Sequence, residues 1–212
     1  MRVNGITGLW NSRHAEDWRQ SLSHYWNLVS RANLDVEKEF EQLNPDEIRL
    51  LDQCGWYEFL LRKYFPWKYT ARNRLATTTK HLKKYDETDS LSVLWEIKHR
   101  LFNFDKVDIS TGLKIATEIK GLGPPGASGL LAVLFPRHFG TVDQFAVKAL
   151  RQVDGLPESA PLLRMNPDSL RHQDAVTLIQ IMRNKAQDLN SIFSSDEWTP
   201  RKIDKILWGF GR

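Results

Sequence analysis

The sequence predicts an all-α fold, and three observations carry this prediction. Apolar residues recur at helical spacing in most segments of the 212-residue chain. No stretch alternates apolar and polar residues as a half-buried strand would. Helix start signals are frequent, among them Asn44-Pro45-Asp46-Glu47, where an N-cap residue precedes proline and two acids. We therefore expect helices joined by short Pro/Gly-punctuated loops and no sheet.

In chain order, the first helix is expected over residues 10–31, where Trp and Leu side chains fall on one face. A short acidic helix is expected over residues 35–43, and then a longer one that begins at Asn44 and ends at Pro66. Caps and apolar stripes predict the remaining helices over residues 71–85, about 90–101, from Ser110 onward, 143–153, from Asn166 onward and from Thr199 to Gly209.

Composition places the chain among ordinary globular proteins, with 41% hydrophobic and 26% charged residues. A chain of this length can hold one sizeable core or two small lobes. No apolar run approaches the roughly 18 residues that span a bilayer, and residues 1–5 lack the apolar core of a signal peptide. We expect a cytoplasmic protein that neither binds a membrane nor needs an obligate protein partner.

Cysteine and histidine usage argues against a metal cofactor. Cys54 is the only cysteine, which excludes an internal disulfide and a four-cysteine iron–sulfur cluster, and its apolar neighbours predict a buried thiol. The six histidines show no pairing at metal-ligand spacing. We therefore expect no metal.

Basic and aromatic residues are concentrated between residues 60 and 85, where no acidic residue occurs. This composition neutralises phosphates and stacks bases, although it also describes a solvated helix face backed by core aromatics. We favour the solvated face for residues 80–84. For Trp67-Lys68-Tyr69, which follows Pro66, we favour a nucleic-acid contact.

The stretch from Ile119 to Leu134 predicts two helices joined by a tight Gly-Leu-Gly turn. Gly121 and Gly123 permit positive φ and a close backbone approach. Proline suits the first turn of the second helix, because the N–H that it lacks would have no helical partner there. The free amides at the N-terminus of the second helix, where the helix dipole is positive, form a phosphate-binding site.

This stretch resembles the helix-hairpin-helix and Gly/Pro-Asp signature of the HhH-GPD superfamily of base-excision DNA glycosylases. The match comprises the Lys120–Gly123 turn, the small residues Gly126 and Ala127, and Val142-Asp143 with the helix that follows. It covers roughly residues 112–153.

The resemblance implies a two-lobed helical fold with a cleft between the lobes. By this analogy, residues 33–135 form the six-helix lobe, which ends in the hairpin at about 110–134. Residues 1–32 and 136–212 form the second lobe, with Asp143 at the interface. The family's iron–sulfur cluster, found in some members, is excluded here by the cysteine count.

The activity implied is hydrolysis of the bond between a base and its deoxyribose in double-stranded DNA. A fixed carboxylate can stabilise the positive charge that develops on the sugar, or orient and deprotonate a water. Asp143 matches the family's catalytic acid, and a helix N-terminus should favour its ionised form. An aspartate at a helix start is commonplace, so the hairpin upstream is what favours catalysis.

The resemblance also implies DNA contacts. The hairpin would bind the DNA backbone independently of base sequence. The contacts would come from the amides of Gly121, Gly123 and Gly126, with Leu122 and Pro124 beside them. Lys120 and Lys148 are candidate phosphate neighbours, with a solvated surface lysine as the alternative for each. Lys68 is a candidate DNA contact from the basic and aromatic segment described above. A monovalent cation held by hairpin carbonyl oxygens is a further expectation.

The target base must leave the duplex and enter a pocket. Candidates for stacking it or filling its gap are Trp56, Tyr57, Trp67, Tyr69 and His138, each of which could equally be core or surface. Family members that cut the strand carry a lysine where this chain has Pro125, so we expect an enzyme without lyase activity that leaves an abasic site. The sequence does not distinguish an oxidised, alkylated, mispaired or bulky phage base as the one that is excised. It likewise leaves open whether the enzyme acts in repair or in phage defence.

Two other readings compete with a DNA glycosylase. One is a non-catalytic DNA-binding protein that uses the hairpin alone. The other is a helical interaction protein whose hairpin is only a packing turn.

Overall fold

The computed structural model describes residues 5–212, and 72% of the chain is helical with no strand in this range. The predicted all-α class is confirmed. Its elements are α1 (Gly5–Trp10), α2 (Ala15–Leu28), α3 (Arg31–Glu41), α4 (Pro45–Leu50), α5 (Gln53–Phe59), the π-helix η1 (Leu60–Tyr64), α6 (Phe65–Lys68), α7 (Arg72–Glu87), α8 (Leu91–Asn103), α9 (Ile109–Thr117), α10 (Pro124–Leu134), α11 (Gln144–Leu150), α12 (Ser159–Arg164), α13 (His172–Phe193) and α14 (Pro200–Gly211).

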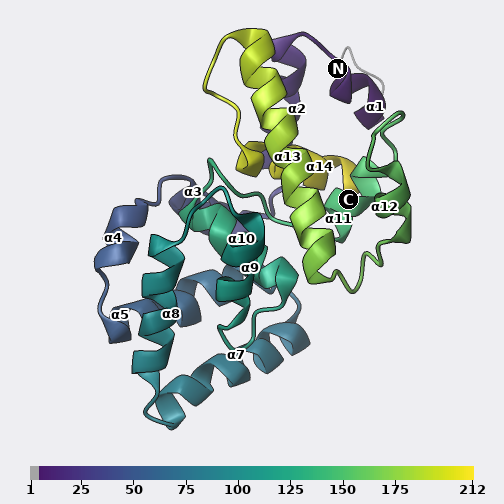
Figure 1. Ribbon diagram of the computed structural model, residues 1–212. Coiled ribbons are helices and arrows are strands. Elements are labelled where there is room, and N and C mark those ends of the chain that lie inside the picture. The colour runs from purple at the N-terminus through teal and green to yellow at the C-terminus, as the bar shows by residue number, and fades with distance from the viewer. Residues whose placement is uncertain (1–4) are drawn as a thin grey trace.

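The helices gather in two groups, with α3 to α10 on one side and α1, α2 and α11 to α14 on the other (Figure 1). In the first group α8 packs against α5 and α9, and α9 against α10. In the second, α14 packs against α2, α11 and α13. Contacts of α13 with α9 and α10 join the groups, and their buried side chains form a single cluster. The boundaries of separate domains at residues 32/33 and 135/136 stay a prediction.

The hairpin consists of α9, a turn over residues 118–123, and α10. Asp108, rather than the expected Ser110, caps α9, because its carboxylate accepts a hydrogen bond from the amide of Thr111 at 2.9 Å. Ser110 instead lies 3.0 Å from a ring nitrogen of His172 in α13. The hairpin is thereby linked to the second group of helices.

Three tyrosine hydroxyls from earlier helices hold the turn. Each donates a hydrogen bond to a carbonyl oxygen of the hairpin: Tyr85 to Glu118 at 3.1 Å, Tyr69 to Gly121 at 3.1 Å, and Tyr64 to Gly126. Because all three rings are buried, these bonds form away from competing water. The turn is therefore fixed by the first group of helices before any ligand binds.

The two glycines of the turn differ in what they require. Gly121 adopts φ 98°, and a Cβ there would lie 2.6 Å from the carbonyl oxygen of Thr78. Gly123 has φ −87° and open space around it, so the expectation of positive φ is wrong for this residue. Only Gly121 is required by conformation and by close backbone approach.

Local polar contacts break two of the expected helices. The expected helix over residues 10–31 is interrupted at 11–14, where Ser12 accepts a hydrogen bond from the amide of His14 and donates one to Asp17. The helix expected from Asn44 is interrupted at Leu51, because Asp52 caps a new helix by accepting from the amide of Gly55. Short polar side chains bonded to nearby amides outweigh the apolar periodicity here.

Pro66 does not end the helical path, which runs from Gln53 to Lys68. The π-helical turn η1 widens the helix just before it, and Pro66 falls in the first turn of α6, where a missing N–H is tolerated. Cys54 is exposed at the start of this path, so the predicted buried thiol is wrong. α13 begins at His172 rather than Asn166, which instead forms a turn with the amide of Asp168.

Candidate functional site

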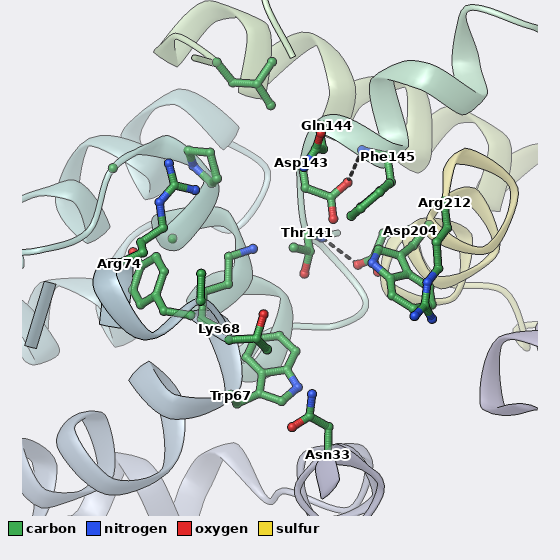
Figure 2. A pocket seen from close by; sticks show the side chains of 18 of the residues that line it. Asn33, Trp67, Lys68, Arg74, Thr141, Asp143, Gln144, Phe145, Asp204 and Arg212 are labelled. Carbon is green, nitrogen blue, oxygen red and sulfur yellow. Dashed lines mark hydrogen bonds between the residues drawn. The ribbon is translucent and has the colours of Figure 1, made fainter. Parts of the chain in front are cut away.

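A cleft of about 880 Å³ lies between the two groups of helices, and we call it the central cleft. Its walls come from the α2–α3 junction, the segment from α6 into α7, the hairpin turn, residues 141–145, residues 167–170 and α14. Figure 2 shows the side chains that enter it. The volume lies within the range typical of small-ligand sites.

Asp143 lies at the N-cap of α11 and faces the central cleft (Figure 2). Its Oδ1 accepts hydrogen bonds from the amides of Phe145 and Ala146, both at 2.9 Å. Its Oδ2 accepts no hydrogen bond from any residue of 5–212. One oxygen is thus fixed by the helix, and the other is available to a ligand.

The segment that carries Asp143 is tied to the hairpin by Ser128, a buried residue of α10. The Ser128 hydroxyl accepts a hydrogen bond from the amide of Val142 at 2.9 Å and donates one to the carbonyl of Pro125 at 3.0 Å. The amide of Thr141 donates to Asp204 of α14 at 2.6 Å. The carboxylate therefore has a fixed position relative to the hairpin on one side and α14 on the other.

Burial raises the pKa of Asp143 above its ordinary value. Lys68 and the amides of Ala146 and Phe145 act in the opposite direction, as expected for a carboxylate at a helix N-terminus, but burial outweighs them. The net direction differs from the sequence expectation, because that expectation considered the helix end alone.

Lys68 enters the same cleft from the end of α6 (Figure 2). Its aliphatic stem passes Gly129 of α10, where a Cβ would lie 3.2 Å from Cδ and 3.3 Å from Cε. Burial lowers the pKa of Lys68 to about 8, although Asp143 and Asp204 favour its charged form. Lys68 was expected as a DNA contact, and the structure places its side chain in the wall of the cleft.

A buried group of charges forms the floor of the cleft, and Arg201 of α14 is at its centre. Its guanidinium binds Glu37 of α3 at 2.8 Å, Asp204 at 3.1 Å and the hydroxyl of Thr141 at 2.9 Å. Lys205 pairs with Glu37 at 3.5 Å. These contacts join α3 of the first group to α14 of the second beneath the cleft.

The carboxylates of this group differ in acidity. Burial raises the pKa of Asp204 to about 6 despite its contact with Arg201. Burial acts on Glu37 in the same direction, but Arg201 and Lys205 lower the pKa of Glu37 overall. Glu37 also accepts a hydrogen bond from the indole N–H of Trp67 at 2.6 Å, which fixes this ring at the cleft wall.

Seven of the predicted site residues line the central cleft: Asp143, Lys68, Trp67, Tyr69, Gly121, Gly123 and Gly126. Tyr69 is 8% exposed and holds the turn, so its ring has little surface for a base. Trp56 and Tyr57 do not line the cleft, and Trp56 is fully buried and stacked on Phe59.

The other predicted contacts lie around or away from the cleft. Lys120 is exposed, with its ammonium 4.7 Å from the ring centroid of Tyr85, and Lys148 donates to Gln144 at 3.3 Å. Leu122 is buried and Pro124 is half-buried beside the turn.

His138 lines a second pocket of about 370 Å³, together with Arg137, Arg183 and residues of α13. Its carbonyl accepts a hydrogen bond from Arg183. Burial and the nearby guanidinium of Arg183 lower the pKa of His138. The structure gives His138 no place near Asp143.

The hairpin amides that the sequence assigned to phosphate binding are free. No residue of 5–212 accepts a hydrogen bond from the amides of Gly121, Gly123 or Gly126. The carbonyl oxygens of Glu118 and Gly121 already accept bonds from tyrosines, so the implied monovalent cation stays a prediction. Within the described chain, no group of three or more His, Cys, Asp or Glu side chains could hold a metal ion.

A scan against protein-family models, a search of curated proteins and a search of solved structures find no match to this chain. Among residues 5–212 no helix is long and apolar enough to cross a bilayer.

Sequence reasoning missed the buried charges of α14. Arg201, Asp204 and Lys205 stand at i, i+3 and i+4, on the same helix as the apolar Ile203 and Ile206. Charges at core-facing positions require partners. That pattern was the available signal, and it points to acidic partners elsewhere in the chain.

Proposed function

We propose that this protein is a DNA N-glycosylase that holds an extruded nucleotide in the central cleft and uses the Asp143 carboxylate to cleave its N-glycosidic bond. The observation that carries the proposal is the free Oδ2 of Asp143 in a cleft whose wall also contains the unpaired hairpin amides. A carboxylate near C1′ stabilises the positive charge that develops there. The amides bind the neighbouring phosphate.

The charge distribution of the cleft supports a nucleic-acid ligand. Lys68, Arg74 and Arg212 line it, whereas the charge of Arg201 is already paired with Glu37 and Asp204. Cationic side chains around a carboxylate suit a substrate with a negative backbone and a sugar that becomes positive during reaction. The hairpin with Asp143 at the matching distance favours the HhH-GPD fold for the same site.

Base release from a panel of duplexes tests the proposal. The panel contains oxidised, alkylated, mispaired and bulky phage-type bases, and mass spectrometry detects the free base. Wild type should release at least one of them, and Asp143→Asn should reduce the rate by about 100-fold or more. Asparagine is also a good N-cap, so the variant should keep its fold.

Asp108→Asn is the matched control, because Asp108 caps α9 through the same kind of bond outside the central cleft. It should release base at the wild-type rate. Unchanged DNA binding with no base release from any substrate would instead favour a non-catalytic DNA-binding protein. Absence of DNA binding even at low salt would favour a helical interaction protein.

A further inference from the structure

Lys68 is a cation in a place where the structure provides it with no direct partner. Its Nζ forms no hydrogen bond or ion pair with any residue of 5–212, although the side chain is half-buried in the wall of the central cleft. Burying a lone ammonium is costly. Buried lysines elsewhere in the chain do find acceptors, as Lys98 does with the carbonyl oxygens of Arg49 and Leu51. Lys68 differs from Lys98 in that no acceptor from residues 5–212 contacts its ammonium, which is therefore available to a ligand in the cleft.

The backbone around Lys68 makes room for it. The stem runs along α10 at Gly129, where any side chain would meet Cδ and Cε. Figure 2 shows the ammonium directed into the space that Asp143 faces from α11. A sugar held between α6 and α11 would present C1′ to the amine on one side and to the carboxylate on the other.

The environment increases the fraction of Lys68 that is present as the neutral, nucleophilic amine. Burial lowers the pKa of Lys68 to about 8. Asp143 and Asp204 oppose this shift, whereas Arg201 of α14 and Arg74 of α7 support it. At pH 7.5 roughly a quarter of such an amine is unprotonated, against roughly a thousandth of an ordinary lysine.

We propose that the Lys68 amine attacks C1′ of the nucleotide held in the central cleft and forms a covalent imine, so that the protein cuts the strand as well as releasing the base. The inference rests on the proposed glycosylase function. It replaces the expectation of base release alone, which followed from the absence of an amine at Pro125. Here the amine comes from a different element, α6, and reaches the cleft through the space at Gly129.

The bonds balance without an external oxidant or reductant. The nitrogen of Lys68 bonds to C1′ as the C1′–N bond of the base breaks, and the base leaves with that electron pair and takes up a proton. The substituted amine then loses its proton, the C1′–O4′ bond breaks with protonation of O4′, and an iminium forms. Loss of a proton from C2′ expels the 3′ phosphate, and water hydrolyses the imine to return the free amine.

Reductive trapping on a preformed abasic duplex tests this step without requiring recognition of any damaged base. Wild type, Lys68→Met and the control Lys83→Met are each incubated with borohydride and a labelled duplex that contains one abasic site. Lys83 is exposed on α7 and outside the cleft. Wild type and Lys83→Met should give the adduct, and Lys68→Met should give at least about 100-fold less.

Peptide mapping of the wild-type adduct provides a readout that does not depend on the variant's folding. The modified residue should be Lys68, and the trapping rate should rise between pH 6.5 and 8.5 as the amine loses its proton. An adduct on another lysine such as Lys120, or none in wild type, overturns the inference. Base release without any adduct would overturn it while leaving the glycosylase intact, and the Asp143→Asn comparison judges the glycosylase separately.

Discussion

Lys68 makes the stability of the protein depend on pH by an amount that follows from its burial. Burial lowers its pKa to about 8 in the folded chain, against 10.5 for an ordinary lysine. Between these two values the unfolded chain binds more protons than the folded one, so the free energy of unfolding rises with pH. From pH 7 to pH 9.5 the gain amounts to about 2 kcal/mol.

Urea unfolding of wild type and Lys68→Met at both pH values measures this gain, because subtracting the two proteins removes the other titrating groups. The free energy of unfolding of wild type relative to Lys68→Met should rise by about 2 kcal/mol between pH 7 and pH 9.5. The exposed Lys83→Met control should show a pH-independent difference from wild type. A difference for Lys68→Met that is equal at the two pH values would refute the description of its amine as buried.

Two further changes test the hairpin and the buried charges. Gly121→Ser should lose about 2–4 kcal/mol in thermal unfolding, because positive φ costs about 1–2 kcal/mol per residue and its Cβ would meet the carbonyl oxygen of Thr78. Gly123→Ser should stay within about 0.5 kcal/mol of wild type, and equal losses would contradict this account. Arg201→Met should lose about 3–5 kcal/mol in urea unfolding, because buried Asp204 loses its cationic partner and Glu37 keeps only Lys205. The exposed Arg72→Met should lose under about 0.5 kcal/mol, and a similarly small loss for Arg201 would show that the charges are not buried together.

The features that the sequence predicted well depend on neighbours along the chain. The glycine turn, the proline start of α10 and the start of a helix at Asp143 are all determined by a few adjacent residues. The same local logic placed Asn44 and Thr199 correctly as caps, since each accepts a hydrogen bond from an amide within three residues. Short-range chemistry of this kind can be read from one sequence.

The features that the sequence did not reveal depend on residues far apart in the chain. The buried position of Lys68 requires the absence of a side chain at Gly129, and the sequence does not show that these residues meet. Arg201 pairs with Glu37, which lies 164 residues earlier in the sequence. Cys54 shows the converse case, in which apolar neighbours at helical spacing predicted burial but Asp52 began a new helix and left the thiol exposed.

The ion pairs beneath the cleft limit how the protein can move. Opening the two groups of helices like a hinge would separate Arg201 from Glu37 and Lys205 from its acidic partners, and so would break the ion pairs that join α3 to α14. The cleft would then be a rigid, preformed site that does not close around its ligand. The strain of fitting the cleft would fall on the DNA, so a base that is already poorly stacked would enter most easily.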